Sequence, residues 1–479
     1  MTTALTPLPY HLEIAARLES LEPRGWATFA SAIRQEPATA AQAEPADADL
    51  GGDDLEQQLL RHAYRMEPDA HPKVHAAARQ AAEAVGLTVP ISIYQLESME
   101  HANASLAFRK DEAVIALSGN LLALLTDEEL VACFGHELSH HRLWTFQDGR
   151  VLIADRFLGA LTIDAATPPY YLETARRFDL ATELYADRGS LLATRSLEVT
   201  VSSLVKVATG LTDVNAAAFL RQAADARPDR GAEGTSHPET VLRAWALERW
   251  QAGDGDAATA TLLARALDIE RLDLIDRERL DSLTRRLVHD VLAPEWIRTD
   301  AVTGHARQFL VDVTAGVGQP RGWLGRGGAG RSADAASETV EARLPEDAPA
   351  ETRRYVSYVL LDLATVDADL ADESLLECLA VAREAGFEAT FEEVARKELG
   401  MNSRAWDALR RRSEGRRHRS DAPSGESTAT GEPTPSGEST LSRGVTPDHT
   451  EPSTADVAQA PVEQPAAGPA APPGTEPLP

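Results

Sequence analysis

The spacing of apolar and polar residues divides the chain into helices and a few short strands. A helical stretch is predicted from about Leu55 into residues 74–87, where small and apolar residues recur at helical spacing until Gly86 closes the helix. Three short segments rich in β-branched, apolar and aromatic residues then predict strands, at 88–97, 103–109 and 112–118. From Leu121 to about Asp312 the pattern is helical apart from a polar loop at 227–239. The predicted fold class is α+β, mostly helical, with one small β-sheet.

Changes in composition predict the domain boundaries. Residues 35–54 contain few large apolar residues, residues 315–338 are rich in Gly, and Ser, Thr, Pro, Gly and Glu dominate after about residue 420. The predicted parts are an N-terminal helical segment (1–34, with one amphipathic helix), a linker (35–54), the main domain (55–255), a helical extension (256–314), a Gly-rich linker (315–350), a small helical domain (351–415) and a disordered tail (416–479).

Charge and cysteine content exclude several functional classes. The formal net charge of -28 disfavours binding to nucleic acid or to an anionic membrane. Only Cys133 and Cys378 occur, which is too few for a disulfide framework or a four-thiolate zinc module. The N-terminus lacks a secretory signal pattern, and charged residues interrupt the longest apolar stretch, 151–166. We therefore expect a cytoplasmic protein without a membrane span and with no nucleic-acid partner.

The segment VACFGHELSHHRLW, residues 131–144, carries the strongest chemical signal. Thr126 and Glu129 predict a capping box at the start of a helix, and His136 and His140 then project from one face one turn apart. Two imidazoles in this arrangement can bind one zinc ion, and Glu137 lies on the flank where it can take a proton from water. The alternative is a helix whose histidines are ordinary core residues. Cys133, one turn earlier, is interpreted as a small buried residue and not as a ligand.

Catalytic zinc needs a third protein ligand, and residues 175–194 supply a candidate. On a helix, Arg176, Asp179, Glu183 and Asp187 form one narrow stripe. Glu183 can ligate zinc, and Asp187 can accept a hydrogen bond from the other ring nitrogen of a zinc-binding histidine. The competing interpretation is a solvated acidic face, which is common in so acidic a protein.

Taken together, residues 60–250 resemble the gluzincin peptidase family that includes HtpX and the CaaX prenyl proteases of the first type. The resemblance rests on Asn103-Ala104, AVIALS (113–118), HELSH (136–140) and ELYAD (183–187), which follow one another in the family's order. It implies one zinc ion per chain held by His136, His140 and Glu183, with Glu137 as general base and later general acid, and Asp187 hydrogen-bonded to a zinc-binding histidine.

The same resemblance draws attention to SHPETVLR, residues 236–243. His237 is a candidate for stabilising the oxyanion of the substrate, and its alternative role is that of a loop histidine packed before a helix that begins with proline. Membrane members of the family carry transmembrane helices, and none is predicted here. Residues 352–401 weakly resemble TerB-like helical domains, from which we assign no site.

The predicted function is a zinc-dependent metalloendopeptidase that hydrolyses extended or unfolded polypeptides through a zinc-activated water. Strand 112–118 is expected to lie along the edge of the cleft and pair with the backbone of a peptide or protein substrate. One alternative is a catalytically silent peptidase scaffold that acts through its C-terminal helices and tail. Another is a latent enzyme whose N-terminal segment or tail occupies the cleft. The oligomeric state is left open.

Overall fold

The computed structural model describes most of the chain up to residue 420. The described residues are 5–35, 39–40, 57, 59–97, 101–163, 165–226, 232–234, 237–263, 267–310 and 343–420. Most of the two predicted linkers, 35–54 and 315–350, lies outside them, as does the predicted tail beyond residue 420. Residues 343–350 of the second linker are described, and Leu344 and Ala348 are buried among the C-terminal helices. The helices are α1 (Pro9–Leu21), α2 (Pro23–Gln35), α4 (Pro72–Val85), α5 (Leu121–Leu124), α6 (Asp127–Thr145), α7 (Arg150–Thr162), α8 (Pro169–Thr194), α9 (Leu197–Thr209), α10 (Ala216–Asp225), α11 (Thr240–Gln251), α12 (Gly255–Leu263), α13 (Leu274–Val291), η2 (Glu295–Ile297), α14 (Asp300–Leu310), α15 (Ala350–Thr365), α16 (Ala371–Glu384), α17 (Glu388–Glu398) and α18 (Ser403–Ser420).

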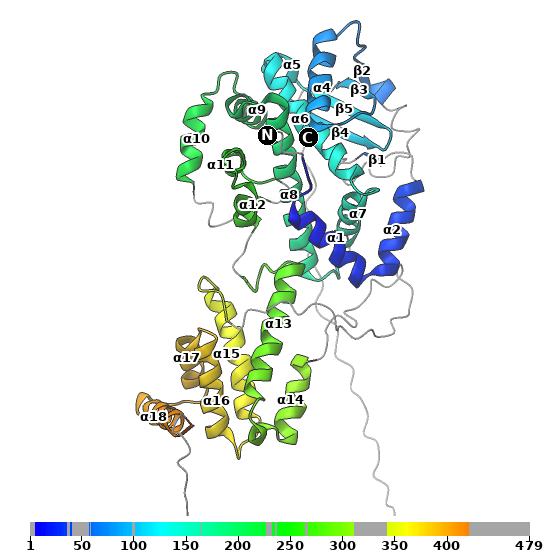
Figure 1. The fold of residues 1–479 in the computed structure, drawn as a ribbon. Helices are drawn as coiled ribbons and strands as arrows, with labels where there is room; N and C mark the ends of the chain where they lie inside the picture. The colour runs from blue at the N-terminus through cyan, green and yellow to red at the C-terminus, as the bar shows by residue number, and fades with distance from the viewer. Residues whose placement is uncertain are drawn as a thin grey trace, which may run out of the picture. The chain divides into compact units, whose positions relative to one another are not determined.

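One mixed sheet of five strands lies beside α4 and α6 (Figure 1). Its strands are β1 (Thr39–Ala40), β2 (Ala63–Arg65), β3 (Ile91–Leu96), β4 (Asn103–Arg109) and β5 (Glu112–Ser118), in the spatial order β1-β4-β5-β3-β2. β3 and β5 are parallel, and the other three pairs are antiparallel. The α+β class and the three predicted strands are therefore confirmed.

The strand order contradicts one prediction. β5, which the sequence analysis places at the edge of the cleft, lies between β4 and β3 and is hydrogen-bonded on both sides. The five consecutive residues Ala113–Leu117 are apolar and buried, which is typical of a strand covered on both faces, and such a run does not tell which strands lie on either side of it. A substrate cannot pair with β5 in this sheet.

The helical stretch predicted from about Leu55 to residue 87 is wrong in its middle, although residues 59–62 are helical as predicted. Residues 63–65 form β2, which pairs antiparallel with β3 and so requires an extended backbone that local helical periodicity does not reveal. α4 begins at Pro72, a residue suited to the first turn of a helix, and ends before Gly86, whose φ of 74° is the left-handed conformation that terminates helices.

The main core joins the sheet to α6, α8, α4 and the N-terminal helices. Ala104, Leu106 and Phe108 alternate along β4 and face inward, where β4 packs against α6. The N-terminal segment forms two helices and not one, because Pro23 disfavours helical backbone at the preceding residue. α1 packs against α7 and α8, and the ring of His11 lies 5.0 Å from that of Phe178. The N-terminal helices therefore belong to the same core as the motif helix.

The C-terminal helices form a second core. It contains buried residues of α13 to α17 together with Trp406 and Leu409 of α18. α13 contributes to both cores, since Leu274 and Ile275 belong to the first and residues 280–291 to the second. The TerB-like resemblance of residues 352–401 stays a prediction. In the part of the chain that the structure describes, no helix is long and apolar enough to span a bilayer.

Candidate metal centre

The helix that carries the histidine motif begins as the sequence predicts. The hydroxyl of Thr126 accepts a hydrogen bond from the Glu129 amide at 3.2 Å, and the Glu129 carboxylate accepts one from the Thr126 amide at 2.9 Å. The same carboxylate accepts a hydrogen bond from Lys206 Nζ at 2.8 Å, which fixes the first turn of α6 to α9. The capping box is confirmed, and it marks the start of the helix that carries His136 and His140.

α6 and α8 approach closely, which brings the motif to the acidic stripe of α8. A methyl group at Gly189 would overlap the Ser139 hydroxyl, so only glycine lets α8 come this near to α6 at that point. The hydroxyl of Ser190 donates to the carbonyl oxygen of Ala132 at 2.8 Å and bridges the two helices. This contact places residues of α8 within reach of imidazoles on α6.

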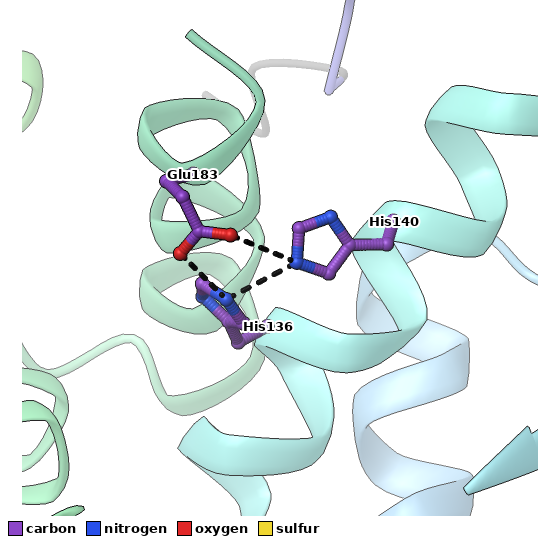
Figure 2. Close-up of side chains that lie close together, drawn as sticks. All are labelled: His136, His140 and Glu183. Atoms are coloured by element: carbon purple, nitrogen blue, oxygen red, sulfur yellow. Dashed lines mark hydrogen bonds and ion pairs between the residues drawn. The ribbon is translucent and has the colours of Figure 1, made fainter. Parts of the chain in front are cut away.

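Three side chains converge between these helices (Figure 2). His136 Nε2 and His140 Nε2 lie 3.2 Å apart, and Glu183 oxygens lie 3.4 Å and 3.5 Å from these two nitrogens respectively. Among the described residues, these three form the one group of metal-ligating side chains whose ligand atoms all lie within 4.8 Å of one another.

This spacing fits a zinc ion. Atoms bound at about 2.0 to 2.1 Å around one tetrahedral ion lie about 3.3 Å apart, which matches the separations of the three ligand atoms. Two imidazoles and one carboxylate are also the donor set of a catalytic zinc site that keeps a fourth position open. The cluster is therefore consistent with a zinc site, and Cys133 is not part of it.

The orientation of each histidine is fixed by a neighbour. His136 Nδ1 lies 3.1 Å from Asp187 Oδ1, which leaves Nε2 for a metal ion. The ring of His140 stacks on Trp144, with centroids 5.3 Å apart and planes 23° from parallel. The predicted placement of Asp187 beside a zinc-binding histidine thus agrees with the geometry.

Arg243 is a site residue that the sequence analysis did not single out. Its Nε and Nη2 donate to the two oxygens of Asp187 at 2.7 Å and 2.6 Å, and Nη2 lies 3.3 Å from Glu183 Oε2. Arg243 lies on α11. Its position six residues after His237, within the segment 236–243, is the one feature of the sequence that could have indicated that it belongs to the site. The Arg243 guanidinium compensates the negative charges of the buried Asp187 and Glu183 carboxylates, and it holds in place the Asp187 carboxylate that orients His136.

His237 also reaches the cluster, although it lies in the loop before α11. Its Nδ1 is 3.1 Å from Glu183 Oε2, and 56% of its side chain is exposed. The structure thus brings together all six residues that the sequence analysis selected, with Glu137 directly beside His136 on α6. The predicted catalytic roles of Glu137 and His237 stay predictions.

Burial and the neighbouring charges shift the pKa values of the two histidines of the cluster in opposite directions. Burial alone would lower the pKa of His136, but Glu183 and Asp187 raise it to about 10. Burial, together with the charge of His136, lowers the pKa of His140 to about 3. Burial opposes ionisation of Glu183, yet His136, His237 and Arg243 hold its pKa well below the usual range. Without metal at neutral pH, His136 is therefore a protonated imidazolium and His140 a neutral imidazole.

The environment of Glu137 differs from that of Glu183. Its side chain is buried, and burial raises the pKa of Glu137 to about 7, with His136 opposing this shift and Glu183 adding to it. A carboxyl group with a pKa near neutrality can both accept and return a proton at physiological pH, which is what general acid–base catalysis needs.

These pKa shifts predict that zinc binding displaces about one proton at pH 8. His136 must lose its proton to bind the ion, whereas His140 and Glu183 are already deprotonated, and Glu137 is largely ionised at that pH. The apparent zinc affinity should therefore rise about tenfold per pH unit from pH 8 to pH 9. Calorimetric titrations with zinc in buffers of different ionisation enthalpy measure the proton count. A count near zero would contradict the protonation state assigned to His136.

Comparisons with known proteins match parts of this chain to metallopeptidases. Residues 68–144, which include HELSH but not Glu183, match the model of peptidase family M48. The chain is 30% identical over 204 residues to the plastoglobule-localized metallopeptidase 48, chloroplastic, of Arabidopsis thaliana. That match covers 37% of this chain and 56% of the relative, so the chain spans little more than half the length of the relative. No solved structure matches the chain.

Proposed function

We propose, from the match of residues 68–144 to the model of peptidase family M48, that the chain is a zinc-dependent metalloendopeptidase that cleaves extended or unfolded polypeptides. The observation that carries the proposal is the mutual spacing of 3.2 to 3.5 Å among the ligand atoms of His136, His140 and Glu183. Glu137 follows the first of these ligands directly, so a general base stands next to the centre.

Each residue has a distinct part in hydrolysis. Zinc, when bound, supplies a Lewis acid that polarises the scissile carbonyl group and acidifies water. Glu137 accepts the proton of the attacking water and returns it to the leaving amine. His237, with Nδ1 directed to Glu183, offers Nε2 to the developing oxyanion of the substrate. Asp187, held by Arg243, keeps the ring of His136 in place.

The free edge of β4 is the position in this sheet where we place the substrate backbone. β1 pairs only with Ala107 and Phe108, so among the described residues Asn103–Leu106 have no strand on that side. β4 also lies against the motif helix, since His141 Nε2 is 2.8 Å from the carbonyl oxygen of Arg109. Pairing through main-chain groups would accept many side chains but only an extended peptide, which is why we expect unfolded substrates.

Zinc content and peptide hydrolysis test the proposal. We expect the purified full-length protein to hold about one zinc ion per chain, as catalytic sites of this type do, and to cleave unstructured peptides internally. A chelator should remove both metal and activity, and added zinc should restore them. Protein that is zinc-loaded but cleaves no peptide would instead favour the catalytically silent scaffold. The cytoplasmic location expected from the sequence stays a prediction.

A further inference from the structure

Arg176 connects the helix of Glu183 to the loop that carries His237. Its Nη1 donates to the carbonyl oxygens of Gly234 at 2.9 Å and of Ala232 at 3.3 Å. Its Nε and Nη2 each donate at 2.7 Å to one oxygen of Glu173, on the preceding turn of α8. The guanidinium is therefore fixed along one edge by a carboxylate and binds the loop backbone with the remaining nitrogen.

The backbone that Arg176 binds is in direct contact with His237. A methyl group at Gly234 would overlap the carbonyl oxygen of His237, so these two residues pack backbone against backbone. The amide of Ala232 donates to the Leu262 carbonyl oxygen at 2.9 Å, and that of Glu233 donates to the Glu239 carboxylate at 3.0 Å. A shift of residues 232–234 would therefore move His237.

The position of His237 matters because its ring reaches the metal cluster from an exposed loop. Nδ1 lies 3.1 Å from Glu183 Oε2, while more than half of the side chain is exposed to solvent. Little of the ring is packed, so the loop backbone has to fix its place. Arg176 precedes Glu183 by seven residues, two turns on the same helix. One rigid element thus holds both the carboxylate and the loop that brings His237 to it.

We propose that Arg176 is a positioning residue that clamps the backbone of residues 232–234 and thereby keeps His237 against Glu183 for catalysis. The inference rests on the proposed peptidase function. Arginine suits the position because its planar group satisfies a carboxylate with two nitrogens and two carbonyl oxygens with the third. Lysine carries the same charge but cannot make both sets of bonds, so it should substitute only partly.

Hydrogen exchange of the full-length protein tests the clamp without reference to activity. In Arg176→Gln we expect the amides of Ala232 and Glu233 to exchange about tenfold faster, because the backbone they belong to loses its anchor. Arg176→Lys should give an intermediate rate. Arg383→Gln is the matched control, since Arg383 also pairs through Nε and Nη2 with a single carboxylate, that of Glu388 on α17, and should leave the loop unchanged. Unchanged exchange in Arg176→Gln would overturn the inference.

A double-mutant cycle with His237 tests the role in catalysis. On an unstructured peptide we expect Arg176→Gln to lower kcat about tenfold, with KM changed by less than about twofold and one zinc ion retained. In the His237→Ala background, Arg176→Gln should lower kcat by less than about twofold, because the imidazole that Arg176 positions is then absent. Equal losses in the two backgrounds would overturn the inference. If the wild-type protein cleaves no peptide, the proposed function fails, and the exchange rates alone then decide whether Arg176 holds the loop.

Discussion

Replacing Glu137 with glutamine is expected to lower kcat on an unstructured peptide by at least about a thousandfold while the zinc content stays at about one ion per chain. Glutamine has nearly the same shape as glutamate, but its amide cannot take up the proton of the attacking water. Glu137 is not one of the three clustered ligands, so its loss leaves the metal set complete. Kinetics and metal analysis on the same preparation measure both quantities.

The stability of this variant separates catalysis from folding. Burial raises the pKa of Glu137, so the folded protein favours the neutral form of this carboxyl group. Ionisation of Glu137 therefore lowers the free energy of unfolding at any pH above the pKa that Glu137 has in the unfolded chain. Glutamine is neutral, and the Tm of the metal-free protein should therefore not fall at neutral pH. Glu128→Gln, an exposed position in the first turn of the same helix, is the matched control and should keep full activity. A Glu137→Gln enzyme that holds zinc and retains a tenth of the activity would contradict the assigned role.

Glu183→Gln is expected to weaken zinc binding by roughly a hundredfold or more, because it replaces the one anionic ligand with a neutral amide. The pKa of Glu183 lies well below its usual range because His136, His237 and Arg243 stabilise the carboxylate, so the wild-type group is ionised at neutral pH. Competition against a fluorescent zinc chelator measures the affinity. Activity at limiting zinc should fall in parallel.

Asp179→Asn is the matched control for this substitution. Asp179 lies one turn before Glu183 on the same stripe of α8, but it does not belong to the metal cluster. Burial, with Asp155 and Glu183 adding to it, raises the pKa of Asp179 to about 8, so at pH 7 asparagine replaces a mainly uncharged acid. Zinc affinity should stay within a few fold of wild type. Unchanged affinity in Glu183→Gln would remove Glu183 from the ligand set.

The metal-free stability of Glu183→Gln follows from the same pKa shift. A carboxyl group whose folded pKa is depressed stabilises the fold above its unfolded pKa of about 4.3, and this contribution is lost as the pH falls through the folded value. At neutral pH the variant loses the contribution entirely, and Arg243 and His136 lose a partner. The metal-free Tm should therefore fall at pH 7, and added zinc should recover less of it than in the wild-type protein.

Much of the site was predictable because it depends on local sequence. The capping box of Thr126 and Glu129 starts α6, and helical periodicity then places His136 and His140 on one face. The same periodicity places Glu183 and Asp187 one turn apart on α8. Strands β3, β4 and β5 were likewise visible from their composition. These features need only the geometry of a single helix or strand.

The tertiary structure alone decided how these elements meet. The position of β5 inside the sheet, the strand at residues 63–65 and the pairing of Arg243 with Asp187 all join segments distant along the chain. The contacts of Arg176 with the loop at residues 232–234 and of His237 with Glu183 also join segments that are distant along the chain. Periodicity reports which face of an element is buried, but not which element buries it. The sequence by itself therefore determined the candidate ligands and the candidate base, whereas long-range packing decided which residues contact them and in which order the strands lie in the sheet.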